Sequence, residues 1–172
     1  SYLVYLAKSL NLRPLLVHFN DGFSNPVAGQ NIRNIVKKTN FELRTITSDW
    51  RESKDLRIAL LKSSIINFAM SMDIGFTNAL YGVAHKENIK HIFTGNSFRT
   101  EGITPLYWSY FDGYSLKKIH GKFGSVPLRT WKPDDPGFHL DLHHLIYYSL
   151  YKKIRIYMPL YFYNYDRSTV DE

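Results

Sequence analysis

The feature that most constrains the fold is the alternation of short strand-like runs with segments of helical periodicity in the first hundred residues. The strand-like runs are 14–19, 41–48 and 91–94. Apolar residues three and four positions apart predict helices at 3–10, 28–36, about 53–68 and 76–84. This order predicts right-handed βαβ units, so we expect an α/β fold with a parallel sheet and helices on both faces.

The pattern weakens after residue 105. A helix is predicted at 114–123, and apolar periodicity at 142–150 predicts another. The run 154–162 is strand-like but contains Pro159, which suits an edge strand. We therefore divide the chain into an α/β core at 1–105 and a C-terminal extension of the same domain at 106–172, helical with an aromatic-rich end.

Composition narrows the class of protein. The 172 residues correspond to one domain, and the absence of cysteine excludes a disulfide scaffold and a cysteine nucleophile within the chain. No apolar run is long enough to span a bilayer, so we expect no membrane span. The absence of cysteine fits a reducing compartment, and we expect a cytoplasmic protein. The net charge of +7 suits a polyanionic partner, and it equally suits an ordinary basic surface.

Polar residues follow each predicted strand of the core. They are Asn20-Asp21-Gly22, then Asp49-Trp50-Arg51, then Gly95-Asn96 with Arg99-Thr100-Glu101 further on. Ligands of open parallel sheets bind at the carboxyl ends of the strands, so these groups are predicted to converge on a site. The alternative is that Asn, Asp and Gly serve only as helix caps and turn residues. A turn does not need Arg99 or Glu101.

Longer stretches carry a family resemblance. They are 2–22, 49–52, 72–102 and 159–166, and the most specific are HFNDG at 18–22 and TGNSFRTEG at 94–102. With these stretches the chain resembles the PP-loop ATP pyrophosphatase superfamily, and within it the N-acetyl sugar amidotransferases of bacterial surface-polysaccharide biosynthesis. The resemblance extends over nearly the whole chain.

The resemblance implies a Rossmann-like fold of the adenine nucleotide alpha hydrolase type, with strand order 3-2-1-4-5. It also implies that a first strand and a phosphate-binding SGGxDS loop come before the helix at 3–10. We therefore expect the chain to be an internal fragment that lacks this central strand and loop. Backbone groups of the two flanking strands would then lack partners.

The family's chemistry is ATP-dependent adenylation of a carbonyl oxygen. In the sugar amidotransferases the carbonyl belongs to the acetamido group of an N-acetylated sugar or nucleotide-sugar. Ammonia from a separate glutaminase subunit then displaces AMP and leaves an acetamidino group. The resemblance thus implies an enzyme that uses ATP with Mg²⁺ and has no nucleic-acid partner, although the chain offers no clear set of Mg²⁺ ligands.

Site residues follow from the matched positions. The resemblance places adenine and ribose at Phe19, Asn20 and Asp21, and it places ribose and the α-phosphate at Thr94, Gly95 and Asn96. Arg99 and Glu101 are the predicted catalytic residues, with Arg99 contacting phosphate or another anion. Asp73 and Thr100 are predicted substrate contacts. Glu101 equally suits a carboxylate at a helix start, and Asp73 suits a cap before the helix at 76–84.

Two other functional classes remain open. The basic charge favours a PP-loop enzyme that acts on tRNA, either a thiolase or a lysidine-type ligase. The thiolating relatives carry cysteines before the helix at 76–84, where this chain reads SMDIGF. A non-catalytic nucleotide-binding module is the second alternative.

Histidines near the C-terminus are candidate metal ligands. His139 and His143 are four residues apart on a predicted helix, and His144 is adjacent. Asp141 is expected to point elsewhere on that helix, which leaves the histidines without a carboxylate ligand. The sequence therefore predicts no metal site.

Overall fold

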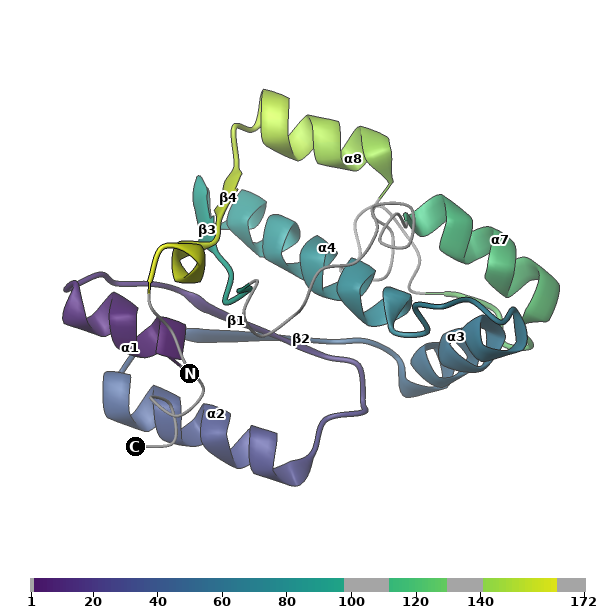
Figure 1. Cartoon of the computed structure of the whole chain (residues 1–172), viewed down its shortest axis with the longest axis horizontal. Helices are drawn as coiled ribbons and strands as arrows, with labels where there is room; N and C mark the ends of the chain where they lie inside the picture. The colour runs from purple at the N-terminus through teal and green to yellow at the C-terminus, as the bar shows by residue number, and fades with distance from the viewer. Residues whose placement is uncertain (1, 98–111, 130–140, 164–172) are drawn as a thin grey trace.

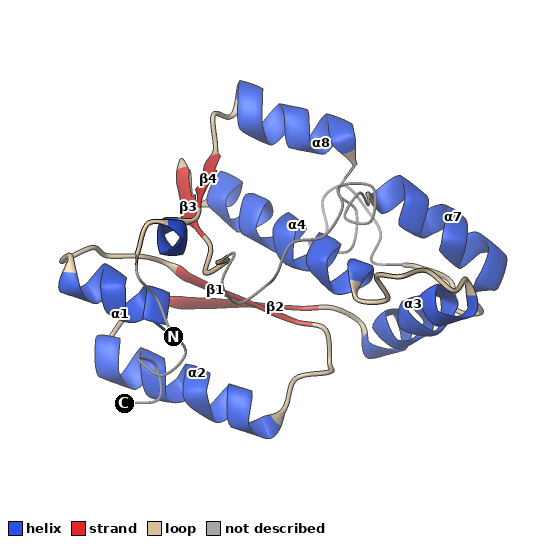
Figure 2. Cartoon of the chain, viewed as in Figure 1, coloured by secondary structure: helices blue, strands red, loops and turns tan. Residues whose placement is uncertain are grey.

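A computed structural model describes residues 2–97, 112–129 and 141–163 (Figure 1). Helices and strands alternate along the core, and Figure 2 separates the two classes by colour. The core elements are α1 (Tyr2–Ser9), β1 (Leu16–Asn20), α2 (Pro26–Thr39), β2 (Leu43–Thr47), α3 (Trp50–Lys62), α4 (Met70–Lys86) and β3 (His91–Phe93). After these come α7 (Gly113–Phe123), α8 (Leu142–Ile146) with a π-helical turn (Tyr147–Tyr151), β4 (Arg155–Tyr157) and a 3₁₀ turn (Pro159–Tyr161). Among the described residues the predicted order of elements is confirmed, except that the run 154–162 forms a strand only at Arg155–Tyr157 and continues as the 3₁₀ turn.

The strands form two parallel pairs in the described part of the chain. β1 pairs with β2, with Leu16 opposite Leu43, and β3 pairs with β4, with Ile92 opposite Ile156. The α/β class with parallel strands is therefore confirmed. The described strands of the two pairs do not hydrogen-bond to one another, so the described residues do not establish a single sheet.

Local chemistry sets the helix boundaries. The Asn25 side chain accepts a hydrogen bond from the Val27 amide and caps α2, which begins with Pro26. Asp49 caps α3 by accepting from the amides of Arg51 and Glu52, so α3 begins at Trp50, three residues before the predicted start. It ends at Lys62 rather than near residue 68, because Ser64 takes a positive φ of 54°.

Helices cover both sides of the β1–β2 pair. α4 lies on one side, and α1 and α2 lie on the other (Figure 1). Buried apolar side chains of the core come from β1, α3, α4, β3 and α7, and they include Phe19, Leu56, Leu60, Ile74, Ile92 and Leu116. No helix in the described ranges is both long and apolar enough to cross a bilayer.

Candidate functional site

The turn after β1 is held by its own side chains. The Asn20 Oδ1 accepts a hydrogen bond from the Gly22 amide at 3.0 Å, and the Asp21 Oδ1 accepts from the Phe23 amide at 3.1 Å. The Asp21 Oδ2 lies 2.8 Å from the Nη2 of Arg57, and both side chains are largely buried. Both carboxylate oxygens of Asp21 are therefore engaged within the protein. This is the role of a turn residue, which the sequence left open as the alternative to a ligand contact.

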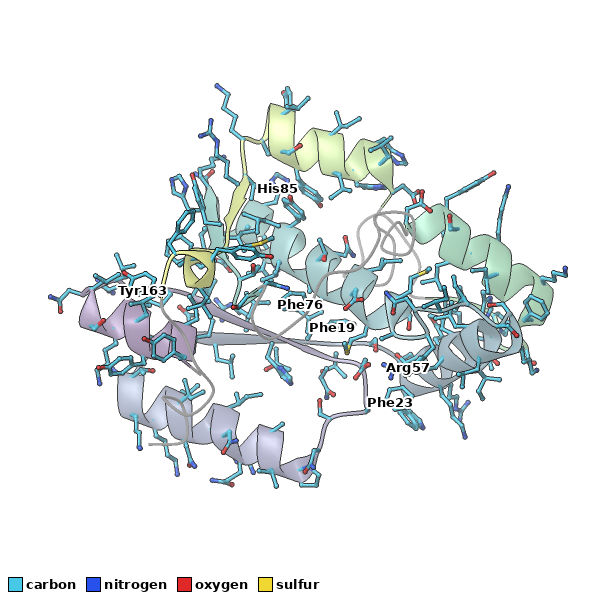
Figure 3. All side chains as sticks on the ribbon, viewed as in Figure 1. Phe19, Phe23, Arg57, Phe76, His85 and Tyr163 are labelled. Atoms are coloured by element: carbon cyan, nitrogen blue, oxygen red, sulfur yellow. The ribbon has the colours of Figure 1, made fainter. Side chains whose placement is uncertain are left out.

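Arg57 was not anticipated from the sequence. It projects from α3, and its guanidinium carbon lies 4.1 Å from the centroid of the Phe23 ring, which in turn lies 4.8 Å from the Trp50 ring (Figure 3). The ion pair joins Arg57 to Asp21, which lies 36 positions earlier in the sequence. One sign of this contact was present in the sequence, an arginine on a helix that is otherwise amphipathic. The cluster of Asp21, Phe23, Trp50 and Arg57 closes the turn after β1 with an ion pair and a cation–π contact.

Gly22 permits this packing, and its substitution gives a direct test. Its φ is +86°, and a Cβ added there would clash with the Cε3 atom of Trp50. Gly22→Ala is therefore expected to lower the free energy of unfolding by about 2 kcal/mol, as measured by urea denaturation.

Gly82→Ala is the matched control for this substitution. Gly82 lies inside α4, and a Cβ there would meet no described heavy atom within 4 Å. The control is expected to raise stability by about 0.5 kcal/mol through helix propensity. An equally stable Gly22→Ala variant would show that the turn relaxes away from Trp50.

The end of β3 presents a buried hydroxyl beside an open glycine. The Thr94 amide donates to the carbonyl of Tyr157 at 3.0 Å, and the residue is only 6% exposed. Its Oγ1 has no hydrogen-bond partner among the described residues. Gly95 has no described atom within 4 Å of a would-be Cβ. Gly95 therefore leaves room for a ligand to approach the backbone closely, and the Thr94 hydroxyl beside it is a buried donor with no described acceptor.

Thr94 and Gly95 line one cavity of about 850 Å³, together with His18 of β1. Most of its walls are apolar. Phe19, Asn20, Asp21 and Asn96 do not line it, although they come from the same strand ends, and Phe19 packs into the core. The structure thus brings two of the predicted nucleotide-binding residues to the cavity and places the other four outside its walls.

The remaining predicted residues are distributed as follows. Asp73 lies in the first turn of α4, which begins at Met70, so the expectation that Asp73 precedes its helix is wrong. Its Oδ2 lies 3.4 Å from the Nδ2 of Asn67. Arg99, Thr100 and Glu101 lie outside the described residues, and their roles stay predictions.

The C-terminal histidines differ from expectation. Ligand atoms of Asp141, His143 and His144 lie within 4.8 Å of one another. Asp141 is the residue just before α8, so its side chain is not bound to the helix face on which it was expected. Burial lowers the pKa of His144, and the charges of His143 and Lys117 lower it further, outweighing the opposite effect of Asp141. A neutral imidazole is the metal-binding form, but the Lys117 ammonium opposes a cation here. His139 lies outside the described residues.

Comparisons with known proteins identified no relative of this chain. No family model, curated protein or solved structure matches this chain. The residues of the chain itself, above all those at the end of β3 and around the cavity beside it, are therefore the basis for assigning a function.

Proposed function

We propose that this chain is the nucleotide-binding core of a cytoplasmic ATP-dependent amidotransferase that converts the acetamido group of an N-acetylated sugar or nucleotide-sugar into an acetamidino group. The observation that carries the proposal is the buried, unpartnered Thr94 hydroxyl beside Gly95 at the carboxyl end of β3. Such an end is where open parallel α/β folds bind nucleotides.

The strand pairing supports the finer fold. In the order 3-2-1-4-5, the second strand lies beside the third and the fourth lies beside the fifth. The observed pairs β1–β2 and β3–β4 have this arrangement if β1 is the second strand of the family. A Rossmann-like layout of the adenine nucleotide alpha hydrolase type is therefore part of the proposal.

The reaction has a simple physical logic. An amide oxygen is a poor leaving group, so ATP first converts it into a mixed phosphate ester with release of pyrophosphate. Ammonia, supplied by a glutaminase partner, then attacks the carbon, and the original oxygen departs within AMP. The Thr94 hydroxyl would donate a hydrogen bond to the ribose or the α-phosphate, and Gly95 would let the backbone approach the nucleotide.

In the described part of the chain, magnesium fits best as a companion of the triphosphate. Asp21 follows β1, but its carboxylate is already bonded to Arg57. The chain therefore does not offer Asp21 as a ready Mg²⁺ ligand. Phosphate oxygens and water would hold the ion, which is its usual environment in nucleotide sites.

Nucleotide binding tests the proposal at Thr94. Thr94→Val removes the hydroxyl and nearly keeps the shape, so we expect the affinity for a fluorescent ATP analogue to fall about tenfold. Thr45→Val is the matched control, because Thr45 lies exposed on β2 away from the cavity. Unchanged affinity in Thr94→Val would remove the observation on which the proposal rests.

Conversion of the acetamido group to an acetamidino group is tested with the whole protein of which this sequence is part or all. It would be incubated with ATP, ammonium and an acetamido nucleotide-sugar, and AMP, pyrophosphate and replacement of the acetamido oxygen by NH would be followed by mass spectrometry. Absence of the amidine product alongside retention of tRNA on a filter would favour the tRNA-modifying alternative, which the net charge of +7 suits. Nucleotide binding without turnover on either substrate would favour a non-catalytic module.

A further inference from the structure

Three side chains of metal-ligating type meet at the start of α8. Ligand atoms of Asp141, His143 and His144 all lie within 4.8 Å of one another, and this is the one such group of three that the described residues contain. Imidazole nitrogens suit borderline transition metals, and a carboxylate supplies negative charge for the cation. The residue types and their closeness therefore match a metal site, which the proposed function does not use.

The backbone holds the three residues in one turn. The Asp141 carbonyl accepts hydrogen bonds from the amides of His144 and Leu145 at 3.0 and 3.1 Å. Asp141 has an extended backbone at the N-cap position, but its side chain makes no capping hydrogen bond to α8. Leu145 and Tyr148 pack against the core cluster, and the Tyr148 ring stacks on that of Tyr81 of α4 at 5.2 Å. The turn that carries the three side chains is thus anchored to the core.

The separation of the ligand atoms is close to that around a bound ion. Zinc binds imidazole nitrogen and carboxylate oxygen at about 2.1 Å in tetrahedral geometry, so neighbouring ligand atoms are about 3.4 Å apart. Atoms that lie within 4.8 Å of one another reach this separation by closing about 1.5 Å at most. His143 is exposed, so its ring can change rotamer without disturbing the core.

The charges next to the site are mixed. The start of α8 lies beside α7 (Figure 1), and the Lys117 ammonium on α7 interacts electrostatically with Asp141 and His144. This positive charge weakens the binding of a cation, and the Asp141 carboxylate opposes that effect. Three protein ligands leave one coordination position of zinc open, as in catalytic rather than structural sites. The ammonium favours an anionic ligand in that position, such as hydroxide or a carboxylate.

We infer that Asp141, His143 and His144 bind a divalent transition metal ion of the zinc type and leave one coordination position open to an anionic oxygen ligand. Magnesium does not suit these ligands, because it prefers six oxygen atoms. The site is therefore chemically separate from the magnesium that accompanies ATP in the proposed function. It also uses different residues from Thr94 and Gly95, so the two proposals can be tested apart.

Zinc binding in the absence of nucleotide tests the inference. The whole protein that carries this sequence is purified without a histidine tag and titrated with Zn²⁺ against a chromophoric zinc indicator, in a buffer with millimolar Mg²⁺. Loss of an outer-shell partner already weakens a metal site about tenfold or more, so loss of a ligand in His143→Ala should weaken it at least about tenfold. Co²⁺ should give visible absorption bands with the parent that His143→Ala lacks. Because His143 is exposed, the variant should keep the circular dichroism of the parent.

Two further variants distinguish a metal site from general surface binding. His91→Ala removes an exposed imidazole of β3 that lies outside the group of three, so it should bind Zn²⁺ as the parent does. Lys117→Met removes the opposing charge, so it should bind Zn²⁺ at least about threefold more tightly at low salt. A gain of affinity in Lys117→Met is not expected if the three side chains only hold α8 in place.

Four results would overturn the inference: equal Zn²⁺ binding by His143→Ala and the parent, equal weakening in His91→Ala, displacement of the ion by millimolar Mg²⁺, or no gain of affinity in Lys117→Met. Thr94→Val should bind Zn²⁺ as the parent does. None of these readouts involves nucleotide, so failure here leaves the Thr94 result standing, and failure at Thr94 leaves the metal site standing.

Discussion

Asp55→Ala is expected to lower the free energy of unfolding by about 4 kcal/mol, the largest effect of a single substitution that we predict. The Asp55 Oδ2 accepts hydrogen bonds from the amides of Ser125 and Val126 and from the Nε2 of His120, at 2.8, 2.9 and 2.8 Å. The carboxylate is 9% exposed. Alanine would leave three donors without their acceptor at the junction of α3 with the end of α7.

The consequence extends beyond one contact. Glu52, one turn earlier on α3, accepts from the Arg129 amide at 2.8 Å. The two acidic side chains thus tie the segment after α7 to α3. We expect loss of Asp55 to detach this segment in part, and hydrogen exchange at Val126 should accelerate.

Urea denaturation measures the effect, with Asp49→Ala as the control. Asp49 also accepts two backbone hydrogen bonds, but it is an exposed cap of the same helix, so the control should lose only about 1 kcal/mol. Equal losses in the two variants would show that the buried network contributes no more than an ordinary cap.

The same carboxylate makes stability depend on pH. Burial by itself raises the pKa of Asp55, but hydrogen bonds from the amides of Val126 and Ser125 and from His120 more than offset this, so the pKa lies below its ordinary value of 3.8. A group with a lowered pKa in the folded state stabilises the protein above its unfolded pKa, and this contribution is lost as the pH falls through the folded pKa. The stability difference between the parent and Asp55→Asn should therefore be constant near neutral pH and shrink below about pH 4. A difference that grows on acidification would contradict the assignment.

Leu60→Ala is expected to lower the free energy of unfolding by about 3 kcal/mol. The Leu60 side chain on α3 is 0% exposed and belongs to the core cluster that joins α3 to α4. Truncation removes apolar contacts and leaves a void that close-packed neighbours fill only in part.

Leu61→Ala is the control for this prediction. Leu61 is the next residue on the same helix, but it is 60% exposed. The substitution has the same chemistry and a similar effect on helix propensity, so stability should change by less than about 0.5 kcal/mol. Calorimetry of the two variants therefore measures how burial of the leucine side chain affects thermal stability. Equal losses would show that α3 is rotated relative to the position described above.

Local pattern was enough to predict the elements. The spacing of Leu3, Leu6 and Ala7 predicted α1, and the runs around Val17 and Ile92 predicted β1 and β3. These features depend on neighbours within one or two turns, where helix and strand periodicities act. Boundaries were less accurate where a cap decided them, as Asp49 does for α3.

The site could be predicted only in part. The carboxyl ends of β1, β2 and β3 were predicted to within one residue, and Thr94 and Gly95 line the cavity, while their roles as nucleotide contacts stay predictions. The sequence did not show that both oxygens of Asp21 are engaged, because one of them binds Arg57, 36 residues away. Nor did it place Asp141 beside His143, since that depends on how the chain enters α8.

By itself, then, the sequence determined the order and type of the described elements and the polar ends of the strands, because each depends on nearby residues. Only the tertiary structure decided the ion pair of Asp21 with Arg57, the network around Asp55, which reaches 71 residues along the chain to Val126, and the cavity that keeps β1 and β3 apart. These depend on the packing of distant segments, and their energies come from burial and from hydrogen bonds that no local pattern encodes.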